Sequence, residues 1–115
     1  MSAKAKFYSD KEFDFLQKFL RHVEDEIGRA RRNFPGNKNL GYAFTEESGE
    51  LIKALLDYSN AQEKSSVLGD LVIKRYHSDI YKEAVQTAAM LFRLMLEGSP
   101  ELEFKGLIKW ANSGH

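Results

Sequence analysis

The chain has 115 residues, of which 43% are hydrophobic and 30% charged, a composition that fits one globular domain with a modest core and excludes a disordered chain. Its 17 basic and 17 acidic residues cancel, so it lacks the basic excess of a dedicated nucleic-acid-binding protein, and nucleic acid is an unlikely partner. With no cysteine, the chain has no disulfide, zinc thiolate or thiol nucleophile, and no apolar run approaches the length of about 18 residues that spans a membrane.

The first residues, MSAKAKFYSDKEF, lack the apolar core of a signal peptide. Together with the absence of cysteine, this predicts a cytoplasmic protein. We expect one domain over residues 1–115, with its core at about 10–97 and a short C-terminal helix at about 101–111.

The first predicted helix runs from about Asp10 to about Arg32, and Ser9 or Asp10 can cap its start. Its apolar residues recur at alternating steps of three and four, which is the spacing of one helical face: Phe13, Leu16, Leu20, Val23, Ile27 and Ala30. A loop follows at NFPGNKN, in which Pro35-Gly36 is a strong turn signal.

A second helix is predicted from about Leu40 to about Ser59. The next segment, Asn60–His77, leaves three interpretations open, because VLGDLVI is compatible with a short helix, a strand or a packed loop. A third helix, Asp79–Glu97, is apolar on nearly every side and ends at the Gly and Pro of EGSP. No segment alternates like a strand, so the sequence predicts an all-α bundle of about four helices.

Apolar residues also lie on the back of the second helix, where Ile52 and Leu56 point away from its core face. A third helix that is apolar all round needs a second buried surface as well. These patterns predict an oligomer, a homodimer or a homotetramer.

Three glutamates crowd into the second helix at FTEESGELIKALLDYS. At about 100° per residue, Glu47 falls at the centre of the apolar face, Glu50 about 60° away at its edge, and Glu46 about 100° away, just outside. An ionised carboxylate on a burying face is costly unless something compensates its charge. A simpler interpretation stays open, in which Thr45 is an N-cap and the acids favour the first turn of a helix.

The third helix repeats the pattern, because Glu83 lies among apolar neighbours and Gln86 lies about 60° from it. Oxygen ligands that converge from two helices suit Mg²⁺, for which Mn²⁺ is a substitute, and the ion would offset the clustered negative charge.

Two motifs resemble those of the MazG-like nucleotide pyrophosphohydrolases, in particular the small single-domain proteins of phages and bacteria. EESGE, at 46–50, resembles the family motif EExxE, and YKEAVQTAAMLFRL, at 81–94, resembles the helix that carries the ExxD motif. The resemblance covers about 40–97. It implies an all-α, oligomeric, Mg²⁺-dependent enzyme that splits a nucleoside triphosphate into a monophosphate and pyrophosphate.

Carried over residue by residue, the resemblance implies magnesium ligands at Glu47, Glu50 and Glu83, with Glu46 in support of catalysis. Gln86 stands where the family has an aspartate, so it is a neutral metal ligand, a contact to the base of the substrate or a contact to an ordered water. An alternative alignment sets LGDLVI against the second motif and makes Asp70 the metal ligand, but it puts Val67 where a glutamate belongs.

Cations are expected beside the phosphates of such a substrate, and Lys53 and Arg93 are the main candidates, with Lys74, Arg75 and Lys82 behind them. Two functions follow. The first is a magnesium-dependent pyrophosphohydrolase acting on ribo- or deoxyribonucleoside triphosphates. The second, favoured by the neutral Gln86, is a catalytically degenerate bundle that binds a nucleotide or a partner protein without turnover.

Overall fold

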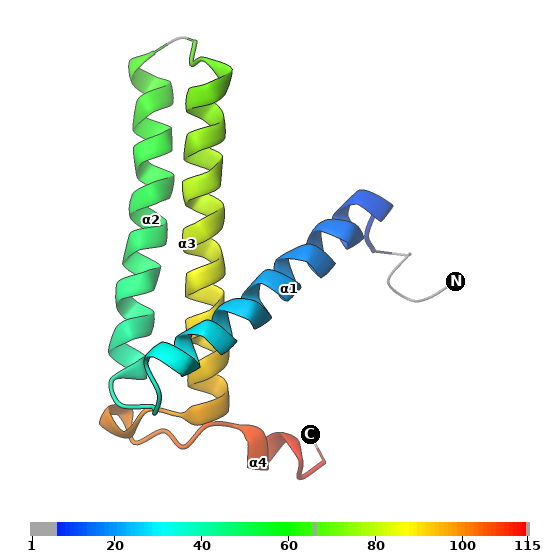
Figure 1. Cartoon of the computed structure of the whole chain (residues 1–115), viewed down its shortest axis with the longest axis vertical. Coiled ribbons are helices and arrows are strands. Elements are labelled where there is room, and N and C mark those ends of the chain that lie inside the picture. The colour runs from blue at the N-terminus through cyan, green and yellow to red at the C-terminus, as the bar shows by residue number, and fades with distance from the viewer. Residues whose placement is uncertain (1–6, 66, 115) are drawn as a thin grey trace.

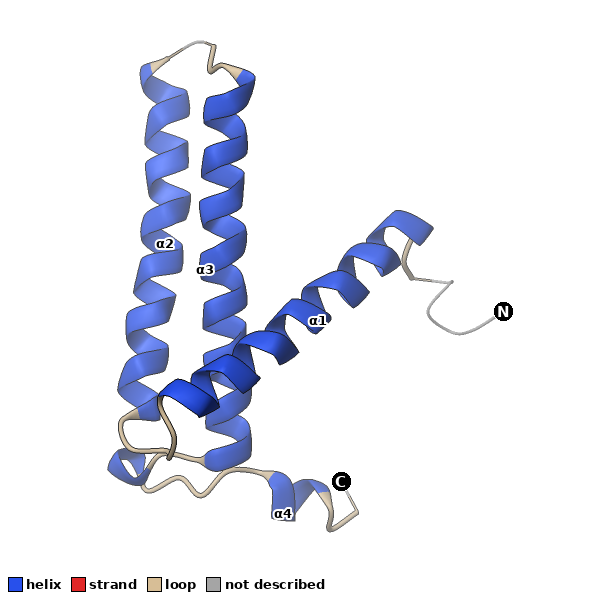
Figure 2. Cartoon of the chain, in the orientation of Figure 1, coloured by secondary structure: helices blue, strands red, loops and turns tan. Residues whose placement is uncertain are grey.

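The computed structural model describes residues 7–65 and 67–114, and in this part of the chain no strand is present (Figure 2). Three long helices, α1 (Asp10–Asn33), α2 (Leu40–Lys64) and α3 (Asp70–Glu97), precede a 3-10 helix η2 (Pro100–Leu102) and the short helix α4 (Ile108–Ala111). The predicted all-α fold of about four helices is confirmed. None of the described helices is long and apolar enough to cross a membrane.

Helices α2 and α3 form a long antiparallel hairpin, and α1 crosses the lower part of α3 with its N-terminal end pointing away (Figure 1). The fold is therefore open on several sides. Its radius of gyration is 17.4 Å, whereas a compact chain of this length has about 13 Å. Much of the apolar surface is left without cover inside a single copy of the chain.

The small core lies where α1 crosses α3. Val23 of α1 packs against Val85 and Ala89 of α3, and partly buried neighbours surround them, namely Phe19, Ile27, Tyr81 and Ala88. The predicted stripe of α1 supplies its half of this contact. The predicted cap is also confirmed, because the Ser9 hydroxyl accepts a hydrogen bond from the Glu12 amide and the Glu12 carboxylate accepts one from the Ser9 amide.

The ambiguous segment 60–77 is mostly helical. Helix α2 continues to Lys64 instead of ending at Ser59, and α3 begins at Asp70 instead of Asp79. Both predicted bounds are wrong. The residues after Ser59 are mostly polar and show no apolar periodicity, and the short apolar run near Asp70 does not distinguish a helix from a strand. Thr45 is not an N-cap, since α2 begins at Leu40 and the Thr45 hydroxyl donates to the carbonyl oxygen of Gly41.

The predicted tail helix at 101–111 is wrong over its N-terminal part, because the helix there begins only at Ile108. Gly98 and Gly106 have φ values of +76° and +84°, which interrupt a helix, and a Cβ at Gly106 would lie 2.7 Å from the carbonyl oxygen of Leu96. The backbone of Ser99 pairs instead with that of Phe104. Only the last turn of the prediction remains, as α4.

Candidate metal centre

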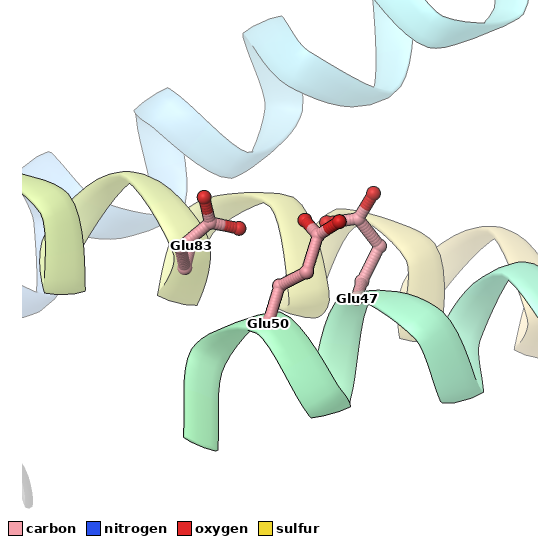
Figure 3. A group of neighbouring side chains, drawn as sticks. All are labelled: Glu47, Glu50 and Glu83. Carbon is pink, nitrogen blue, oxygen red and sulfur yellow. The ribbon is translucent and has the colours of Figure 1, made fainter. Parts of the chain in front are cut away.

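Three carboxylates meet between α2 and α3. Glu47 and Glu50 are one turn apart on α2, and Glu83 faces them from α3 (Figure 3). One oxygen from each side chain lies within 4.8 Å of the other two. We call these residues the carboxylate group. The periodicity of the two helices predicted that Glu47 and Glu83 lie on apolar faces and that Glu50 lies at the edge of one; Glu47 and Glu83 are half-buried and Glu50 is exposed, as expected.

The Thr87 hydroxyl joins the two helices beside the carboxylate group. It lies 3.0 Å from the carbonyl oxygen of Glu47 and 2.8 Å from that of Glu83, so it can donate to either. This contact links α2 to α3 one turn from Glu83. Thr87 was not among the residues predicted from the sequence, although a hydroxyl four residues after Glu83 on an otherwise apolar face was a signal for it.

Burial makes the charged forms of Glu47 and Glu83 unfavourable, whereas Glu50 is exposed. The Oε2 atoms of Glu47 and Glu83 are both buried and have no hydrogen-bond partner. Burial, followed by repulsion from Glu50 and Glu83, raises the pKa of Glu47 above its ordinary value. Burial, followed by the charge of Glu50, likewise raises the pKa of Glu83. Buried carboxylate oxygens without a donor cost free energy, and a bound cation would offset that cost.

The donor set fits a hard divalent cation. All three side chains offer carboxylate oxygens, which Mg²⁺, Mn²⁺ and Ca²⁺ prefer, and they offer no sulfur or imidazole ligand. A divalent charge would offset the repulsion among the acids and would provide a partner for the two buried oxygens.

Two hollows flank the carboxylate group. The first, of about 390 Å³, lies between α1, the hairpin and residues 34–39, which join α1 to α2 and which we call the 34–39 turn. Glu46, Glu47 and Gln86 line this hollow. The second, of about 420 Å³, continues along the hairpin and is lined by Glu50, Glu83 and Lys53, among others. Glu46 and Gln86 thus lie beside the first hollow, next to Glu47.

Asp70 does not join the carboxylate group. It is exposed in the first turn of α3, thirteen residues before Glu83, which corresponds to about 20 Å along the helix axis. Oxygens of Glu47 and Glu50 lie within 4.8 Å of one from Glu83, so Asp70 is far from these two glutamates as well, and the geometry does not support the alternative alignment through Asp70.

The two predicted cations differ in their surroundings. Lys53 is 77% exposed, lies 3.2 Å from Asp57 and lines the second hollow. Arg93 is only 1% exposed, and its guanidinium donates to the Glu97 carboxylate and to the carbonyl oxygens of Phe34 and Gly36. Arg93 borders the first hollow, but these bonds use it to hold the 34–39 turn on α3. Its contacts favour a structural role over phosphate binding.

Comparison of the chain with protein-family models, with curated proteins and with solved structures finds no match.

Proposed function

We propose that this protein is a Mg²⁺-dependent nucleoside triphosphate pyrophosphohydrolase of the MazG-like type. It would convert a ribo- or deoxyribonucleoside triphosphate and water into the monophosphate and pyrophosphate. One observation carries the proposal: two helices bring the oxygens of Glu47, Glu50 and Glu83 within 4.8 Å of one another, and two of these side chains hold buried, unpartnered oxygens. The same glutamates stand at the glutamate positions of that family's EExxE and ExxD motifs, and Gln86 replaces the aspartate of the second.

The residues of the site have different roles in the proposed reaction. Glu47, Glu50 and Glu83 would hold the metal, which when bound neutralises charge on the phosphates and acidifies a water molecule. Glu46 lies outside the carboxylate group but lines the same hollow as Glu47, and in this proposal it would accept a proton from the attacking water. Lys53 lies beside Glu50, where it would contact the phosphate chain.

The first hollow suits the base and sugar. Its wall includes the apolar side chains of Leu40, Ala89 and Met90, and the Gln86 amide offers a donor and an acceptor beside them. Gln86 therefore has two candidate roles, as a neutral ligand of the metal or as a contact to the base.

The direct test is incubation with a panel of nucleoside and deoxynucleoside triphosphates in Mg²⁺ or Mn²⁺, scored for pyrophosphate. We expect release of pyrophosphate that stops when the metal is chelated. If no triphosphate is cleaved, the activity is excluded. Calorimetric binding of a nucleotide without turnover would then support the alternative, a degenerate bundle, which the neutral Gln86 favours.

Gln86→Asp separates the two roles of this residue. At a metal position, the added carboxylate should tighten Mg²⁺ binding by about tenfold, because the cation gains more from a charged oxygen than from an amide. At a base-binding position, it should weaken binding of a non-hydrolysable triphosphate, because the amide donor is lost. Calorimetric titrations with Mg²⁺ and with the triphosphate measure both. If neither affinity changes, Gln86 lies outside the site.

We further propose that the protein is a homodimer or homotetramer. Ile52 and Leu56 are each 55% exposed on the back of α2, and Leu91 and Phe92 are more than 40% exposed on α3. Light scattering at micromolar concentration should give at least twice the chain mass of 13.2 kDa. The double variant Ile52→Glu/Leu56→Glu should give the monomer mass. A monomeric wild-type protein would contradict the proposal.

A further inference from the structure

The second hollow has an aromatic end. It follows α2 from Glu50 to Asp57 and α3 from Glu83 back to Tyr76. Tyr76 lies two turns from Glu83 on the same face of α3, a distance of about 10 Å along the helix axis. Tyr58 supports the Tyr76 ring from α2, with the ring centroids 5.4 Å apart and the planes inclined by 32°. The hollow thus leads from the carboxylate group to a braced aromatic side chain.

Lys53 would contact the phosphates next to the metal, but the other charged groups along this hollow are acidic, so its end near Tyr76 is a poor site for a bare phosphate. Glu50, Asp57, Asp79 and Glu83 all line it, against the single cation Lys53, which already lies 3.2 Å from Asp57. Asp57 and Asp79 are outside the carboxylate group, so a metal held by that group does not neutralise them directly. The terminal phosphate of a nucleoside triphosphate reaching this end would be repelled by these acids.

An uncharged ribose and base meet the same surroundings favourably. Ribose hydroxyls donate hydrogen bonds to carboxylates, as they do to the acidic residue of dinucleotide-binding folds. A base can stack on a tyrosine ring whatever its identity. The volume of about 420 Å³ is close to that of the first hollow, about 390 Å³, so the carboxylate group has a similar space on each side.

We propose that the second hollow binds a second nucleoside and that the substrate class is therefore the dinucleoside polyphosphates. This inference rests on the proposed pyrophosphohydrolase activity. Water would attack the phosphorus attached to the first nucleoside, its oxygen would remain on that phosphorus, and the P–O–P bond beyond it would break. A dinucleoside triphosphate and water then yield one nucleoside monophosphate and one nucleoside diphosphate, with the leaving oxygen carried away on the diphosphate.

The test compares diadenosine triphosphate with ATP. Hydrolysis is followed in Mg²⁺ by chromatography of the nucleotide products, and binding is measured by calorimetry in Ca²⁺. We expect kcat/KM for diadenosine triphosphate to exceed that for ATP by about tenfold or more, the effect typical of one additional stacked base. Products should be AMP and ADP in equal amounts.

Tyr76→Ala should remove this preference. It should lower kcat/KM and affinity for diadenosine triphosphate by about tenfold, and change those for ATP less than about twofold. Tyr76→Phe keeps the ring and should keep the preference. Tyr42→Ala is the matched control, because Tyr42 is an exposed tyrosine of α2 that borders neither hollow.

The outcomes separate this inference from the proposed function. If kcat/KM for ATP equals that for diadenosine triphosphate, or if Tyr76→Ala lowers both values equally, the second nucleoside site is excluded. The proposed pyrophosphohydrolase activity is then unaffected. If diadenosine triphosphate binds more tightly than ATP through Tyr76 but neither is cleaved, the second nucleoside site is supported and the proposed hydrolase activity is excluded. Absence of binding and of cleavage excludes both.

Discussion

Replacing Glu47 with glutamine should reduce pyrophosphate release at least about 100-fold while raising the melting temperature of the metal-free protein. The first effect follows because the variant loses one of three charged ligands. The second follows because the buried Glu47 carboxylate has an unpartnered oxygen and is repelled by Glu50 and Glu83. Pyrophosphate assays in Mg²⁺ and thermal unfolding in a chelator measure the two effects.

The opposite directions of these two effects distinguish a functional residue from a structural one. Glu50→Gln should behave like Glu47→Gln, whereas Glu63→Gln, an exposed acid near the end of α2, should change neither activity nor stability. Full activity in both Glu47→Gln and Glu50→Gln would remove the proposed site. Added Mg²⁺ should raise the melting temperature of the wild-type protein and have little effect on the two variants.

The raised pKa values also fix the sign of a pH effect. For Glu47 and Glu83, the folded state holds its protons to a higher pH than the unfolded chain, in which these groups titrate near 4.5. Stability of the metal-free protein should therefore rise as pH falls from neutrality through these raised pKa values, and Glu47→Gln should flatten that rise. The pKa of Glu97 is lowered by Arg93, so its contribution is lost only at pH below about 4.5. Protons compete with the metal, so Mg²⁺ affinity should fall over the same range in which the metal-free protein gains stability.

Arg93→Ala should destabilise the fold by about 3 kcal/mol or more, the usual cost of removing one partner from a buried ion pair. The guanidinium is 1% exposed, and its loss would leave Glu97 without its closest cation and the carbonyl oxygens of Phe34 and Gly36 without this donor. Chemical denaturation of the wild-type and variant proteins gives the difference in the free energy of unfolding.

Arg31→Ala provides the matched control for Arg93→Ala. Arg31 contacts the same Glu97 carboxylate at 3.0 Å, but its side chain is 47% exposed, so its removal should cost less than about 1 kcal/mol. Equal losses in the two variants would show that burial and the bonds to the 34–39 turn contribute nothing to the role of Arg93.

The sequence by itself determined the features that depend on residues close together along one helix. A period of 3.6 residues places Glu47 on the apolar face of α2 and Glu83 on that of α3. Each helix keeps these side-chain directions whatever it packs against. The Ser9 cap and the turn at Pro35-Gly36 are local for the same reason, because their hydrogen bonds or dihedral preferences involve only a few neighbouring residues.

Only the tertiary structure decided the features that depend on partners far along the chain. The segment before Asp79 is helical because it lies along α2, and its own short apolar run does not distinguish a helix from a strand. Arg93 has a structural role because its guanidinium donates to two carbonyl oxygens that lie 57 and 59 residues earlier in the chain. The side chain that the sequence predicted as a phosphate ligand therefore holds the 34–39 turn. The carboxylate group likewise forms only because α2 and α3 lie side by side, as the contact between the Thr87 hydroxyl and the carbonyl oxygen of Glu47, 40 residues apart, shows. Helical periodicity fixes the direction of a side chain, but it carries no information about which distant group will lie opposite.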